Sequence, residues 1–188
     1  MDTEQRLIRR LLRVDHAGEH GAVSIYGVQL KRARQHYPDL VPWLEGTLAH
    51  EVEHQAQFRG AMPSRAAKPC RALIVWSWGG KALGAMTALF GRSGIYICTA
   101  AVERTVHHHL QEQLRFLEVS DPPLAQIVAS IETQEVEHLA YAESRHDPSR
   151  TFARILSAIV ASATEALIFL STRGDSIRLR QALTNNLR

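Results

Sequence analysis

Cysteine is scarce in this sequence, and its scarcity excludes two kinds of stabilised fold. The 188 residues contain two cysteines, Cys70 and Cys98, which do not form a C-x-x-C pair. A disulfide framework and a cysteine-type zinc site are therefore not expected. Residues 1–13 are charged and lack the apolar run of a secretory signal. We therefore expect a reducing compartment, of which a bacterial cytoplasm is the simplest case.

The patterns of β-strands and of phosphate-binding loops are missing as well. No segment alternates apolar and polar residues with period two, and the pair Gly79-Gly80 is interpreted as a helix irregularity, not a nucleotide cradle. The residues that dominate are helix formers such as Ala, Leu, Glu, Gln and Arg. Prolines, glycines and Asp-Pro pairs predict six helices, at about residues 4–36, 39–61, 70–90, 94–119, 121–146 and 147–172. We expect one all-α domain over residues 1–174, followed by a loose tail over residues 175–188.

Acidic residues are absent from a long central segment. Between His54 and Val102 there is no Asp or Glu, whereas six basic residues fall there: Arg59, Arg65, Lys68, Arg71, Lys81 and Arg92. Its most apolar part, within residues 70–90, is too short and too interrupted to span a membrane, and it carries Trp76 and Trp78 near one end. Such a helix fits the interface of an anionic membrane. The alternative is a buried crossover connection between two halves of a bundle, and one helix can serve both roles.

An internal repeat carries the metal-ligating chemistry. The tetrapeptide EVEH occurs at positions 51–54 and again at positions 135–138. On a helix its first Glu and its His lie at i and i+3 and project from one face. One such motif is commonly a surface ion pair, but two copies with matching context are typical of a metal site.

The matching context is a glutamate that precedes each motif at the same interval. The sequence separation between Glu19 and Glu51 equals the separation between Glu103 and Glu135. In two antiparallel helical hairpins whose helices have equal lengths, these four glutamates lie at the same level along the bundle axis. The predicted ligands of this centre are Glu19, Glu51, His54, Glu103, Glu135 and His138. A Glu from each of two helices and a Glu-x-x-His from each of two others is the ligand set of ferritin-like di-iron carboxylate bundles.

The donor set favours iron over zinc. Four carboxylates balance the charge of two divalent cations, and oxygen-rich coordination differs from the tetrahedral Cys and His sites of zinc. Manganese is compatible with the same ligands. We expect no catalytic residue beyond the metal centre. Asp15 and His108, each about one turn from a predicted ligand, are candidates to orient ligands from behind. His50 is interpreted as structural, because Gln134 stands at the matching position of the second copy.

Several motifs together resemble one known family. Residues 13–22, which read RVDHAGEHGA, the paired E-x-x-H motifs, residues 101–103 ahead of a His-His pair, and residues 83–91, which read LGAMTALFG, resemble the demethoxyubiquinone hydroxylases of ubiquinone biosynthesis. The likeness covers about residues 9–173. The chain departs from the family at Leu110, where the family has a tyrosine after the histidine pair.

The resemblance implies a di-iron monooxygenase that hydroxylates the ring of a polyprenyl demethoxybenzoquinol. It implies two iron ions with Glu51 and Glu135 as bridges, dioxygen as co-substrate, and a peripheral place on the membrane, at the cytoplasmic face of a bacterial inner membrane. The apolar helix, with Trp76, Trp78, Leu83 and Met86, would then line the substrate entrance. Partner proteins of ubiquinone biosynthesis and a homo-oligomer are both compatible with it, and no nucleic-acid partner is expected.

Two rival functions use the same ligands. A ferritin-like iron-storage or ferroxidase protein would need no organic substrate, but it would have a polar crossover. Another di-metal oxidoreductase, such as a manganese catalase or a tRNA hydroxylase, is the second rival, and the tRNA case would require a basic surface near the metal.

Overall fold

The structure is a computed structural model that describes residues 3–171 and residue 181. Within residues 3–171, six α-helices follow one another: α1 (Thr3–His36), α2 (Val41–Ala61), α3 (Leu73–Ala88), α4 (Gly91–Ser120), α5 (Pro122–Glu143) and α6 (Thr151–Ser171). Two short 3-10 helices, Pro38–Leu40 and Pro63–Arg65, follow α1 and α2. The described residues contain no strand, so the all-α prediction is confirmed. The predicted tail, residues 175–188, lies outside the described residues apart from residue 181.

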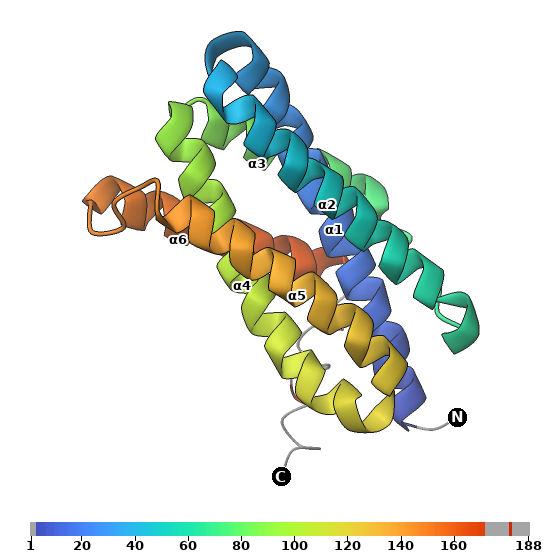
Figure 1. Ribbon diagram of the computed structural model, residues 1–188. Helices are drawn as coiled ribbons and strands as arrows, with labels where there is room; N and C mark the ends of the chain where they lie inside the picture. The colour runs from blue at the N-terminus through green and yellow to red at the C-terminus, as the bar shows by residue number, and fades with distance from the viewer. Residues whose placement is uncertain (1–2, 172–180, 182–188) are drawn as a thin grey trace.

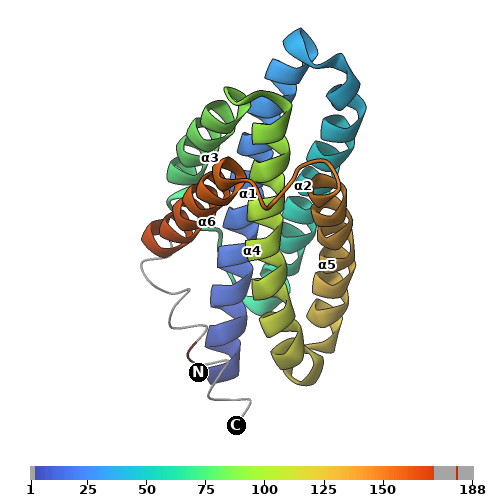
Figure 2. The same ribbon diagram turned by 90° about the vertical axis from the view of Figure 1, so that its left-hand side faces the viewer.

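Two long helical hairpins build a four-helix bundle. Helices α1 and α2 form one hairpin, α4 and α5 form the other, and α2 lies against α5 across the bundle (Figure 1). Helix α3 connects the hairpins by running along the outside of α1, and α6 lies across α4 beside α3 (Figure 2). The predicted ferritin-like bundle with an apolar crossover helix and an additional C-terminal helix is confirmed.

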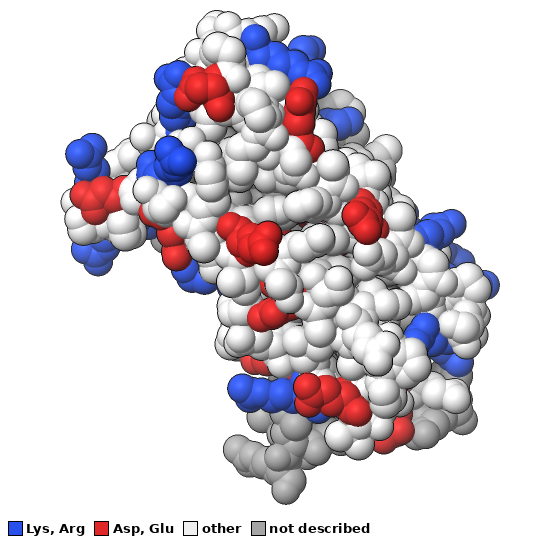
Figure 3. Space-filling model, in the orientation of Figure 1, with Lys and Arg blue, Asp and Glu red and all other residues white. Residues whose placement is uncertain are grey.

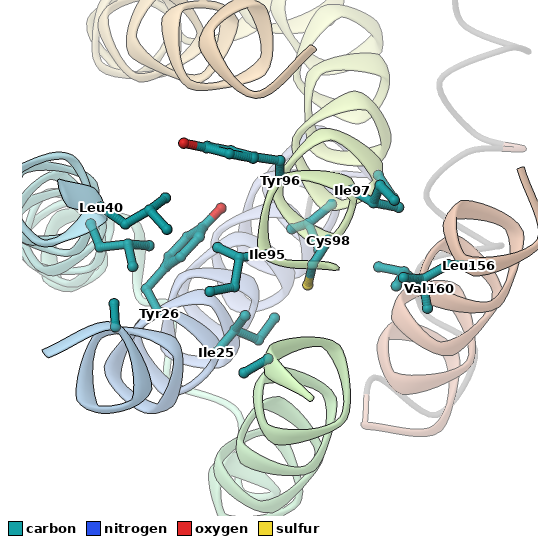
Figure 4. Packing of buried hydrophobic residues seen from close by; sticks show 14 of the residues in the cluster. Ile25, Tyr26, Leu40, Ile95, Tyr96, Ile97, Cys98, Leu156 and Val160 are labelled. Carbon is teal, nitrogen blue, oxygen red and sulfur yellow. The ribbon is translucent and has the colours of Figure 1, made fainter. Parts of the chain in front are cut away.

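The bundle core consists of two apolar clusters with a polar layer between them. One cluster, near the N-terminal end of α1, includes Leu11, Phe58 and Leu117. The other includes Tyr26 and Ile95, which lie near one another in Figure 4. Apolar burial at both ends stabilises the bundle and keeps water away from the layer between them.

Glycines let α3 approach α1 more closely than other residues would. A Cβ on Gly80 would lie 2.5 Å from the carbonyl oxygen of Gly21, and one on Gly84 would lie 2.6 Å from that of Ile25. A Cβ on Gly79 would lie 2.3 Å from Leu167 of α6. The interpretation of Gly79-Gly80 as a helix irregularity is wrong, because both residues lie inside the continuous helix α3. Their role is close helix packing.

Helix α6 differs from the sequence prediction in its start and in its exposure. It begins at Thr151 and not at Asp147, because the Asp147 carboxylate accepts hydrogen bonds from the backbone N–H and the hydroxyl of Ser149 in a local turn. Its segment Thr151–Phe169 is long and apolar enough to cross a membrane, and 22% of that segment is buried. The sequence predicts an apolar surface helix at residues 70–90, and α6 is a second exposed apolar helix that it does not predict.

Candidate metal centre

The two halves of the sequence repeat meet in the polar layer of the bundle. Helices α1, α2, α4 and α5 all contribute, and the six predicted ligands are Glu19, Glu51, His54, Glu103, Glu135 and His138. Each of the six residues is between 0% and 6% exposed. Carboxylates buried together need a positive charge to compensate their negative charge. A cluster of ion pairs on the surface would not need one, because water solvates it.

The potential ligand atoms form two overlapping groups. Glu19 and His54 belong to the first group, Glu103 and His138 belong to the second, and Glu51 and Glu135 belong to both. Within each group the ligand atoms all lie within 4.8 Å of one another. Each group could therefore hold a metal ion, and the two groups share the carboxylates of Glu51 and Glu135.

The pKa values of the four carboxyl groups are strongly shifted by their burial together. Burial raises the pKa of Glu19, Glu51 and Glu103 well above the usual range of a carboxyl, and neighbouring carboxylates add to the effect. Burial acts on Glu135 in the same direction, but hydrogen bonds from His138 and His54 outweigh it and lower the pKa of Glu135 to about 2. A cation bound among these carboxylates would offset the cost of burying their negative charges together.

A pair of divalent cations fits this donor set. One buried carboxylate oxygen, Oε1 of Glu51, has no hydrogen-bond partner in the protein. The negative charges of four carboxylates balance the positive charges of two divalent ions. A mixture of carboxylate and imidazole donors suits iron or manganese. The buried Glu and His groups can hold a metal ion.

Each histidine of the cluster presents one ring nitrogen inward and the other outward. Nδ1 of His54 lies 3.0 Å from Glu135, and Nδ1 of His138 lies 3.3 Å from the same carboxylate. The outward Nε2 of His54 lies 2.5 Å from Oε1 of Gln134, and that of His138 lies 3.0 Å from Nδ1 of His50. His50 and Gln134 are the residues just before the two motifs, so each hairpin supports the histidine of the other.

His50 is therefore expected to support metal binding through His138. Replacement by alanine removes the hydrogen-bond partner that fixes the ring of His138, and losses of this kind typically weaken metal affinity by about 10–100-fold. Replacement by glutamine, which copies position 134, should restore most of the affinity. Competition with a chromophoric chelator measures the effect, with His36→Ala as an exposed control; equal affinities for His50→Ala and wild type would contradict the role.

Tyr26 is a further member of the site that sequence analysis did not single out. Its buried hydroxyl donates a hydrogen bond to Oε1 of Glu103. Burial raises the pKa of Tyr26 well above its usual value, and Glu103 adds to the effect. The phenol is therefore a neutral donor that orients this carboxylate. No motif marks Tyr26, because its role follows from the packing of α1 against α4.

The two residues proposed to orient metal ligands have partners that are not ligands. The Asp15 carboxylate accepts a hydrogen bond from Nε2 of Gln113 at 2.9 Å, so its partner is not a ligand histidine. The ring of His108 is 58% exposed and lies 3.3 Å from Glu112. Neither residue belongs to the two groups of potential ligands.

A cavity of about 110 Å³ extends from the cluster to the outer helices. At one end its wall includes the carboxylates of the metal centre, and at the other it includes residues of α3 and α6. Of the residues predicted to line the entrance, Trp76 and Leu83 line this cavity, whereas Trp78 and Met86 are not in its wall. Trp78 is 69% exposed on the outer face of α3.

A family match and two similar proteins all belong to ubiquinone biosynthesis. The family of ubiquinone biosynthesis protein COQ7 matches residues 6–171. The human NADPH-dependent 3-demethoxyubiquinone 3-hydroxylase, mitochondrial, is 32% identical over 170 residues, which cover 88% of this chain and 77% of the human protein. The 3-demethoxyubiquinol 3-hydroxylase of Rhodospirillum rubrum is 35% identical over 170 residues, 89% of this chain and 78% of the relative.

Proposed function

Because the chain belongs to the COQ7 family of ubiquinone biosynthesis proteins, we propose that it hydroxylates the ring of a polyprenyl demethoxybenzoquinol. It is an oxidoreductase of the demethoxyubiquinone hydroxylase type. The observation that carries the proposal is the cavity, which joins a buried carboxylate and histidine cluster to the apolar helices α3 and α6. A site for an apolar substrate with a reactive ring requires this combination.

The proposed metal ligands are the six clustered residues, with iron in both positions. Glu19 and His54 would hold one ion, Glu103 and His138 would hold the other, and Glu51 and Glu135 would bridge them. The chemistry supplied by two bound iron ions is the activation of dioxygen for insertion of one oxygen atom into the ring.

The chain itself binds the ring, orients it and excludes water. Trp76 and Leu83 from α3 and Leu167 from α6 form an apolar wall beside the carboxylates. Tyr26 and His50 hold the ligands Glu103 and His138 in place through hydrogen bonds. Rigid ligands and a dry cavity keep the reactive centre close to the ring and away from bulk solvent.

The comparisons support this function and not its rivals. An iron-storage protein would have no use for an apolar cavity between α3 and the carboxylates. On the described part of the face in Figure 3, Lys and Arg are interspersed with Asp and Glu, unlike the continuous basic surface of a nucleic-acid interface.

Ring hydroxylation by the purified, iron-loaded protein tests the function. Given a reductant and air, wild type should add one oxygen atom to a short-tailed demethoxyubiquinol, and Glu135→Ala should not. Mass spectrometry of the extracted quinone measures the product. Equal amounts of product from both proteins would contradict the role of the metal centre, and no product from wild type would contradict the function.

The outer faces of α3 and α6 form one apolar surface that we propose lies on a membrane. Ile74, Val75 and Trp78 are exposed on α3, and Ile155 and Ile159 are exposed on α6. The two helices lie side by side (Figure 2), and both line the cavity on their inner sides. A polyprenyl tail would then remain in the lipid while the ring enters between the helices. In a bacterium this surface would face the cytoplasmic side of the inner membrane.

Charged substitutions on this surface should release the protein from lipid. Each aspartate costs about 2.5–3.5 kcal/mol at the centre of a membrane-inserted helix, and less at the interface. The double variant Trp78→Asp, Ile159→Asp should therefore lose at least about tenfold in partitioning to vesicles that contain phosphatidylglycerol. The control is Val119→Asp, which changes an 87% exposed valine at the end of α4. Sedimentation with vesicles measures binding, and equal binding of the two variants would contradict the proposed surface.

A further inference from the structure

One stretch of the cavity wall carries buried polar groups outside the metal centre. Asp15 of α1 and Gln113 of α4 both line the cavity and are 9% and 3% exposed. A hydrogen bond of 2.9 Å from Nε2 of Gln113 to Oδ1 of Asp15 joins them. Their apolar neighbours in the wall include Val14 and Leu110.

Each member of this pair retains one oxygen without a partner. Oδ2 of Asp15 and Oε1 of Gln113 are buried, and neither makes a hydrogen bond within the protein. A third cavity-lining residue, Trp76, has a buried indole N–H that also lacks a hydrogen-bond partner. A buried polar atom without a partner destabilises the folded protein, so three such atoms around one cavity together weaken the fold. A bound ligand with donors and acceptors of its own would remove that cost.

We propose that the Asp15–Gln113 pair binds an oxygen substituent of the quinol ring and thereby sets the orientation of the ring at the metal centre. The inference rests on the proposed function and names residues that recognise its substrate. A hydroquinone hydroxyl donates one hydrogen bond and accepts others, so it can donate to Oε1 of Gln113 and also pair with Oδ2 of Asp15.

The position of the pair suits this role. Asp15 precedes Glu19 by about one helical turn, which is about 6 Å along α1. A ring held by one oxygen at Asp15 therefore reaches toward the carboxylates at its other edge. Leu110, between Glu103 and Gln113 on α4, lines the same cavity and contributes no polar side-chain atom. Along this stretch of α4, Gln113 is therefore the buried polar partner for the ring.

The protonation of Asp15 also suits a neutral ligand. Burial raises its pKa to about 7, although the hydrogen bond from Gln113 acts to lower it. Near neutral pH a large fraction of Asp15 is therefore an uncharged acid, which can donate a hydrogen bond to a ring oxygen.

Binding of two matched ligands to the iron-loaded protein tests the inference. The first ligand is a short-tailed demethoxyubiquinol, kept reduced without air, and the second is the same molecule with both ring hydroxyls methylated. Gln113→Leu should weaken binding of the quinol about tenfold, equivalent to about 1.4 kcal/mol, and leave binding of the methylated ligand within about twofold. Gln111→Leu, an exposed position on the same helix, is the control and should change neither affinity.

A second variant guards against misfolding of the first. Asp15→Asn keeps an oxygen for Gln113 and alters the atom that has no partner, so it should change quinol affinity severalfold without changing that of the methylated ligand. Unchanged quinol affinity in both variants, or equal losses for both ligands, would overturn the inference. Hydroxylation by wild type is measured in parallel: product from wild type with unaffected variants overturns the inference alone, whereas no product from wild type overturns the proposed function as well.

Discussion

Replacement of Glu51 by glutamine is expected to abolish both metal-dependent stabilisation and ring hydroxylation. Glu51 belongs to both groups of ligand atoms and is 1% exposed, so its loss removes a ligand from each cation position. A metal that binds only the folded state stabilises it by about 4 kcal/mol at a free concentration about 1,000 times its Kd. For a chain of this size that corresponds to a rise in Tm of about 8–16 °C.

A thermal melt with and without ferrous iron, in the absence of air, measures this difference. Wild type should show the rise, and a chelator should reverse it; Glu51→Gln should melt at one temperature in all three conditions. Glu53→Gln, on α2 at an exposed position close to Glu51, is the matched control and should behave like wild type. An unchanged rise in Tm for Glu51→Gln would show that iron binds elsewhere.

Replacement of Gly84 by alanine is expected to destabilise the protein by about 1–3 kcal/mol, although alanine favours helix. The new Cβ would lie 2.6 Å from the carbonyl oxygen of Ile25 and 3.1 Å from its Cα, and backbone atoms cannot rotate away. Separation of α3 from α1 would also distort the cavity, since Ile25 and Leu83 both line it. Denaturant unfolding of the metal-free protein measures the loss.

Gly27 provides the matched control for this prediction. It lies within α1, and a Cβ there would meet no atom within 4 Å. Gly27→Ala should therefore stabilise the protein by about 0.5–1 kcal/mol, because alanine loses less conformational entropy in a helix. If Gly84→Ala were as stable as Gly27→Ala, close packing of α3 on α1 would not be the reason for glycine at position 84.

The sequence was sufficient to predict which six side chains meet inside the bundle because they belong to a repeat. The interval between Glu19 and Glu51 matches the length of one hairpin, and the same interval between Glu103 and Glu135 predicts that the four residues meet. Helix positions were predicted for a similar reason, since prolines and glycines mark their ends. These signals are local or periodic, so they do not depend on knowing which helices touch.

Contacts between helices from different parts of the chain could not be predicted in this way. His50 was interpreted as structural because Gln134 is a different residue type, yet each of the two contacts the histidine of the opposite hairpin. Tyr26 and the Asp15–Gln113 pair likewise depend on how α1 packs against α4. The exposure of α6 was missed because a buried and an exposed apolar helix have the same composition, and only packing distinguishes them.

A single turnover with isotopically labelled dioxygen tests the central claim most directly. The protein is loaded with iron to about two ions per chain, as its ligand set requires, reduced without air, and mixed with a short-tailed demethoxyubiquinol. Labelled dioxygen is then added, and the extracted quinone is analysed by mass spectrometry. The account predicts a product with one labelled oxygen atom on the ring, absent in Glu51→Gln. Two bound irons with consumption of dioxygen but no labelled quinone would contradict it and return the chain to an iron-oxidising function.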